Sequence, residues 1–107
     1  MEAFVVMDAM ILGKGVFGIF STVEKAQAFK DQFEASTAFG CEVRRISVIG
    51  TPGSPKSILA AHSYEQIYDS HIFEGLYAEV LLARDAVGEK GLIVEFVIDA
   101  PKSKQVR

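Results

Sequence analysis

The chain has 107 residues, of which 50% are hydrophobic and 23% charged, and its formal net charge is −3. This length and balance fit one folded globular domain and exclude an extended disordered chain. The small negative charge excludes the broad basic field that attracts nucleic acid, so we expect no nucleic-acid partner.

Cysteine usage and the N-terminal residues favour a cytoplasmic protein. Cys41 is the only cysteine, so no disulfide can form within the chain, which favours a reducing compartment. The chain begins Met1-Glu2, whereas a secretory signal begins with basic residues. No apolar run approaches the roughly 20 residues that span a bilayer, so we expect no membrane partner. No motif indicates a cofactor or a resident metal, and we expect neither.

The first half of the chain predicts two strands, a helix and a third strand. The strands are expected at residues 4–10, 16–20 and 42–49, where β-forming residues gather between glycines. The helix is expected over residues 22–35, with Val23, Ala26, Phe29 and Phe33 on one face at helical spacing. Such a stripe is typical of a helix that packs on a core.

The second half predicts the same order of elements. Two prolines and two glycines within residues 50–55 form the strongest break in the chain. Strands are then expected at residues 57–64, 71–73 and 92–99, and a helix over residues 76–87. Its apolar face would hold Leu76, Val80, Ala83 and Val87, and Gly88 would end it.

The stretch Gly13-Lys14-Gly15-Val16-Phe17-Gly18 contains a literal G-x-G-x-x-G, and three interpretations compete. A dinucleotide fingerprint needs a helix to open at the third glycine and an acidic residue after the next strand, and that strand ends in Gly50-Thr51. A kinase phosphate loop needs partner motifs that are absent from the sequence. The favoured interpretation is structural: a glycine turn leads into the strand at residues 16–20.

Residues 18–26 predict where that strand gives way to a helix. Ser21-Thr22-Val23-Glu24 fits a capping box in which Ser21 is the helix cap. The sequence Gly18-Ile19-Phe20-Ser21-Thr22-Val23-Glu24-Lys25-Ala26 also resembles a strand-to-helix junction of small uncharacterised bacterial and phage domains. The resemblance implies this local shape and no function.

The repeated order predicts an α+β fold built from a duplicated β-β-α-β unit. We expect one domain, residues 1–101, made of repeats 1–52 and 56–101 and followed by a disordered basic tail at residues 102–107. In each unit the third strand would pair antiparallel beside the first. Two such units would give a mostly antiparallel, ferredoxin-like sheet with both helices on one face. Two small sheets packed as a pseudo-dimer are the alternative.

The second predicted hairpin carries most of the side chains suited to chemistry. If residues 65–68 form its loop, Tyr64 faces Asp69 and His62 lies opposite His71, all on one face. These four residues could form a general acid/base site or a partial metal site. A shift of the pairing by one residue would separate the histidines. The other interpretation is an aromatic, histidine-rich hairpin that packs within the domain or against a subunit.

Other polar residues are weaker candidates. Asp8 lies in or beside an apolar strand, where a buried carboxylate is costly unless it is paired. Glu74 and Glu79 suit the predicted start of the second helix. Asp85 suits its solvated face, and Cys41 a packed structural thiol.

Three hypotheses follow for function. The first is a non-enzymatic protein-interaction or regulatory domain, expected to be a homodimer because small sheets commonly protect their edges by pairing. The second is a small-molecule binder or small enzyme that uses His62, Tyr64, Asp69 and His71. The third is phosphate or nucleotide binding at residues 13–18.

Overall fold

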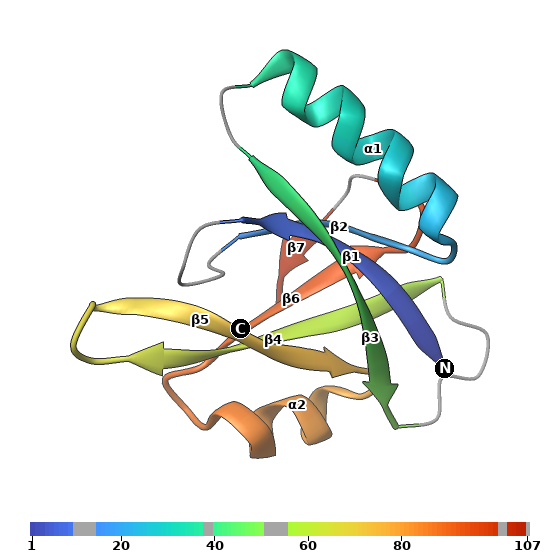
Figure 1. The fold of residues 1–107 in the computed structure, drawn as a ribbon. Coiled ribbons are helices and arrows are strands. Elements are labelled where there is room, and N and C mark those ends of the chain that lie inside the picture. The colour runs from blue at the N-terminus through green and yellow to red at the C-terminus, as the bar shows by residue number, and fades with distance from the viewer. Residues whose placement is uncertain (10–14, 38–39, 51–55, 101–102, 107) are drawn as a thin grey trace.

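The computed structural model describes residues 1–9, 15–37, 40–50, 56–100 and 103–106. Their strands form one seven-stranded sheet in the order β2-β1-β3-β5-β4-β6-β7 (Figure 1). The elements are β1 (Glu2–Asp8), β2 (Val16–Phe20), α1 (Val23–Ser36), β3 (Cys41–Ile49), β4 (Ser57–Glu65), β5 (Ser70–Tyr77), α2 (Val80–Val87), β6 (Leu92–Val97) and β7 (Ser103–Gln105).

The predicted fold class, a mostly antiparallel ferredoxin-like sheet with both helices on one face, is wrong. β3 and β5 pair in parallel through Val48↔Leu76 and Ile49↔Tyr77, so the sheet is mixed. This contact also joins the two halves, which excludes two separate sheets. The sheet curls until it is nearly barrel-shaped, and α1 and α2 lie far apart (Figure 1). Local periodicity reports neither a contact between distant segments nor the curl of a sheet.

Within each half, the pairing is as predicted. β1 is antiparallel to both β2 and β3, and β4 is antiparallel to both β5 and β6. The third strand of each unit therefore lies beside the first strand, after a helix that connects the second strand to the third. That the two units arose by duplication stays a prediction.

The strands bury apolar side chains on both of their faces. Alternate residues of β1 and β4, such as Val5 and Ala60, point into an inner core that also holds Leu76 and Phe96. The residues between them face the helices, because successive side chains of a strand point to opposite faces. A sheet covered on both faces explains why these strands are apolar throughout instead of alternating.

The helix α1 packs on the first unit through aromatic rings. Ala26 is fully buried, and Phe29 and Phe33 pack over the core that includes Val6 and Phe20. The cap is Thr22, whose hydroxyl accepts from the Lys25 backbone N–H at 3.2 Å, so the prediction of Ser21 as cap is wrong by one residue. Ser21 instead donates to a carboxylate from the other half of the chain.

The helix α2 is shorter than predicted. Leu76 and Tyr77 belong to β5, and Leu76 is fully buried in the inner core. Glu79 occupies the cap position without a side-chain hydrogen bond, and Gly88 ends the helix with a φ of 74°, as predicted. Glu74 is therefore a strand residue, not a helix-start residue.

Asp99 joins the end of β6 to the start of α1. Its carboxylate accepts from the Ser21 backbone N–H at 2.8 Å, from the Ser21 hydroxyl at 2.7 Å and from the Lys25 ammonium at 3.2 Å. Its own N–H donates to the Ile19 carbonyl oxygen at 2.9 Å. These bonds link the two ends of the curled sheet.

The C-terminal residues are partly ordered by the sheet. Ser103–Gln105 form β7, which is antiparallel to β6, so the prediction of a disordered tail is wrong for these residues. Neither helix in the described parts of the chain is long and apolar enough to cross a membrane.

Candidate functional site

The predicted site lies on the β4–β5 hairpin, and its register differs from the prediction by two residues. Tyr64 pairs with His71 and His62 pairs with Phe73, so the turn is made by residues 66–69 instead of 65–68. A shift of two residues, unlike a shift of one, keeps every side chain on its predicted face. His62, Tyr64 and His71 therefore share a face, but the two histidines are not directly opposite.

Ring contacts organise this face. The rings of Tyr64 and His71 meet edge-to-face with centroids 5.5 Å apart, and those of His62 and Phe73 do so at 5.7 Å. The Tyr64 hydroxyl donates to the Asp69 carboxylate at 2.5 Å. Three of the four predicted residues are thus linked in the chain Asp69–Tyr64–His71, and His62 lies deeper.

Lys90 is the residue that sequence reasoning missed. It precedes β6, and its ammonium lies 5.7 Å from the centroid of the Tyr64 ring. Its carbonyl oxygen lies 2.9 Å from His71 Nε2. A carbonyl can only accept, so this imidazole nitrogen carries the proton. Lys90 lies far along the chain from the hairpin, and no local pattern connects the two.

Burial makes His62 a poor proton carrier. The side chain is 4% exposed, and burial lowers its pKa because the charged form loses its hydration. A weak hydrogen bond from Nδ1 to the Leu92 carbonyl oxygen, at 3.4 Å, acts in the opposite direction. The neutral imidazole is therefore the form that the fold favours.

The tyrosine is not a base either. Its hydrogen bond to Asp69 raises the pKa of the Tyr64 hydroxyl, since the bond holds the proton in place. Each of the four predicted residues thus has an internal partner. No group of three or more metal-ligating side chains occurs within the described residues. The arrangement fastens the hairpin to the turn before β6, and this role needs no reaction.

The tip of the hairpin is held in a defined shape. Glu65 Oε1 accepts from the Ile67 backbone N–H at 3.1 Å, and the Asp69 N–H donates to the Gln66 carbonyl oxygen at 3.3 Å. Asp69 adopts a φ of 47°, which Asp tolerates better than most residues. The result is a turn that exposes 84% of Ile67 and 58% of Tyr68. In the sequence, two large apolar residues within a turn are the signal that could have identified this exposed tip.

The described part of the glycine motif does not form a phosphate loop. Gly18 lies inside β2, paired with Val6, and α1 begins only at Val23. A fingerprint would place its third glycine at the helix start. The predicted strand Val16–Phe20 is confirmed, whereas the turn at Gly13 and Lys14 lies outside the described residues.

Cys41 and Asp8 offer no separate site. Cys41 is 6% exposed, and burial raises the pKa of its thiol, which disfavours the nucleophilic thiolate. Asp8 is half-buried at the end of β1, level with Cys41 in the register. Glu34, which accepts from the Cys41 backbone N–H at 2.9 Å, is held by Lys30.

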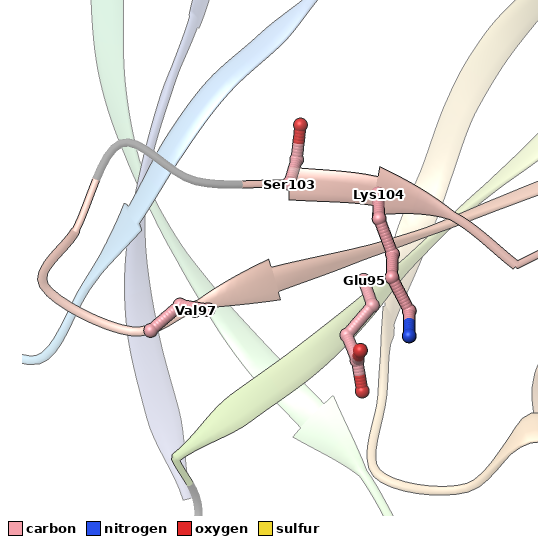
Figure 2. A pocket seen from close by; sticks show the side chains of 4 residues that line it. All are labelled: Glu95, Val97, Ser103 and Lys104. Carbon is pink, nitrogen blue, oxygen red and sulfur yellow. The ribbon is translucent and has the colours of Figure 1, made fainter.

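A shallow depression lies between β6 and β7 (Figure 2). Its volume is about 190 Å³, and it is lined by Glu95, Val97, Ser103 and Lys104. Glu95 also accepts from the Ser57 hydroxyl at 3.1 Å. Pockets that enclose small molecules are typically about 300–1,000 Å³, so this depression is too small and open to serve as one.

Comparison with known proteins adds no identity: no family model, no curated protein and no solved structure matches the chain.

Proposed function

We propose that this protein is a non-enzymatic protein-interaction domain that binds its partner through the tip of the β4–β5 hairpin. The observation that carries the proposal is the 84% exposure of Ile67 and the 58% exposure of Tyr68 on a turn that is held in place. Large apolar and aromatic side chains at exposed positions are typical of contact surfaces.

The rigidity of the hairpin supports this function. The Tyr64–Asp69 bond closes one side of the turn, and the His71–Lys90 bond fastens the hairpin to the rest of the fold. A contact surface that is ordered before binding loses less conformational entropy on association. The polar residues behind the tip are therefore assigned to positioning, and the tip to contact.

Site-specific photo-cross-linking in cells tests the proposal. Tyr68 is replaced by benzoylphenylalanine, and a matched variant carries the same group at Glu89, which is exposed on the turn after α2. We expect a discrete protein adduct from position 68, at least tenfold above that from position 89. The additional change Ile67→Ser should remove most of it. Equal adduct patterns from both positions would contradict the proposal.

A second candidate function is the binding of a small molecule, with Tyr64, His71 and Lys90 as polar contacts. It is favoured by the convergence of these groups on one face of the hairpin. Titration of the labelled protein with a metabolite panel tests it, because a ligand must shift the amide resonances of His71 and Lys90. If none moves while the tip forms adducts, this candidate is discarded.

A further inference from the structure

One edge of β5 is unpaired along most of its length. β4 covers the other edge from Ser70 to Tyr77, whereas β3 reaches only Leu76 and Tyr77. In the part of the chain that the structure describes, no strand pairs with Ser70–Gly75 on this side. Such an edge presents a row of backbone donors and acceptors to another strand.

A buried polar atom lies on the same strand. The Ser70 hydroxyl oxygen is buried, and among the described residues it has no hydrogen-bond partner. A hydroxyl in this position is costly unless it finds a partner.

Exposed apolar residues lie near both ends of this edge. At one end is the hairpin tip, with Ile67 and Tyr68. At the other end is Ile49, which is 51% exposed and is level with Tyr77 in the register. The side chains at both ends are thus exposed to water, and the unpaired edge lies between the hairpin tip and Ile49.

We propose that the partner of this surface is a second copy of the chain, paired antiparallel along the β5 edge about a two-fold axis at Ile72. The inference rests on the proposed contact function of the hairpin. A two-fold axis perpendicular to a sheet makes the same edge of both copies antiparallel, and it brings residues equidistant from the axis face to face.

A two-fold axis at this position gives contacts to the exposed apolar residues and to the Ser70 hydroxyl. The hairpin turn of the second copy, which carries Ile67, approaches the end of the edge where β3 covers Leu76 and Tyr77 and where Ile49 is exposed. Ser70 lies level with Glu74 of the second copy, because Ser70 and Glu74 are equidistant from Ile72. Glu74 already accepts from the Ser63 hydroxyl at 2.6 Å through Oε1, and the second oxygen of a carboxylate can accept from a further donor such as the Ser70 hydroxyl. Each copy gains the same contacts, so every one of them occurs twice.

Disulfide trapping tests the position of the axis. Residues that face each other across a two-fold have Cβ atoms about 4.5–5.5 Å apart, close enough for a disulfide after a small adjustment. Ile72→Cys should form a covalent dimer on mild oxidation. Glu24→Cys, at an exposed position on α1, is the matched control, and the wild type with its buried Cys41 gives the background.

Sedimentation velocity measures the association itself. We expect the wild type to reach twice the 11.7 kDa of one chain as its concentration rises to about 1 mM. Ile67→Asp should weaken the dimer at least tenfold, and Val23→Ser, an exposed apolar change on α1, less than twofold. A wild type that stays monomeric, or a dimer that Ile72→Cys does not trap, overturns the inference. Adducts from position 68 to a different protein would leave the proposed function intact and overturn only the dimer.

Discussion

The two β-β-α-β units hold their helices against the sheet by different means. The 14-residue helix α1 rests on stacked phenylalanines, with the rings of Phe17 and Phe33 4.5 Å apart. The eight-residue helix α2 has no such rings and places the fully buried Ala83 in one cluster with Ala61. One backbone plan is thus filled once with large rings and once with small side chains.

The hairpins of the two units also differ, in how their outer edges are covered. β2 is tied at its free edge, where the Ile19 carbonyl oxygen accepts from the Asp99 backbone N–H. β5 has an edge from Ser70 to Gly75 that no described strand covers. The difference teaches that the first unit uses the edge of its hairpin to close the fold, whereas the second keeps an edge and an apolar tip for contact.

The largest expected effect compares two phenylalanines, one from the second strand of each unit. Phe20 ends β2, is 4% exposed and packs on Phe29, whereas Phe73 is only half-buried in β5. Phe20→Ala should lower the free energy of unfolding by about 3–5 kcal/mol, and Phe73→Ala by roughly half as much because less surface is lost. Urea denaturation measures both. Equal losses would contradict the view that the first unit carries the aromatic core.

Two glycines that precede the third strand of each unit sharpen the comparison. A Cβ on Gly91 would lie 2.9 Å from the Val87 carbonyl oxygen and closer still to its side chain, whereas on Gly40 the nearest contact among the described residues is Ala9 at 4.0 Å. Gly91→Ala should therefore destabilise the fold by about 1–3 kcal/mol, and Gly40→Ala by no more than about 0.5 kcal/mol. Thermal unfolding distinguishes them, and a neutral Gly91→Ala would contradict the close approach of α2.

A smaller effect is expected from acid, and it acts on the second unit. Because burial lowers the pKa of His62 in the folded state, the unfolded chain binds more protons below its ordinary pKa of about 6.5. The free energy of unfolding should therefore fall as the pH drops from about 6.5 through the lowered pKa of the folded state. Above a pH of about 6.5, His62 should not affect it. Denaturation at a series of pH values measures the slope. His62→Gln should reduce the slope, and an unchanged slope in this variant would assign it to other groups.

The smallest effects concern the helix caps. Thr22→Ala removes the bond to the Lys25 backbone N–H and should cost about 1 kcal/mol. Glu79→Ser gives α2 the cap that it lacks and should stabilise the protein by about 0.5–1 kcal/mol. The two variants should thus change the unfolding midpoint in opposite directions. A loss of stability in Glu79→Ser would show that the exposed carboxylate already serves the α2 helix start.

Local sequence patterns predicted most of the strands and helices, but not how the two halves of the chain pair in the sheet. The strand Val16–Phe20 is bounded by glycine and by the helix cap, and its predicted limits are those observed. Leu76 was assigned to a helix because apolar residues at 76, 80 and 83 suit a helical face, yet Leu76 points into the inner core from a strand. A short apolar run fits both structures, and only the pairing of Leu76 with β3 and β4 decides between them.

The sequence predicted that His62, Tyr64 and His71 share one face of the hairpin, but not which residues pair across it. The loop of the hairpin contains the apolar pair Ile67 and Tyr68, and the sequence predicts it one residue too early, at residues 65–68 instead of 66–69. The pattern of apolar residues therefore does not indicate at which residues the turn begins and ends. Lys90 was missed because the antiparallel pairing of β4 with β6, and not a local pattern in the chain, brings it to Tyr64.

The most direct test compares amide hydrogen exchange at the two hairpins at low and high protein concentration. The account predicts that amides within Ser70–Gly75 exchange more slowly in the concentrated sample, whereas those of β2 do not change. Slower exchange confined to one edge would identify β5 as the contact surface. Equal exchange of the β5 amides at both concentrations would contradict self-pairing through this edge.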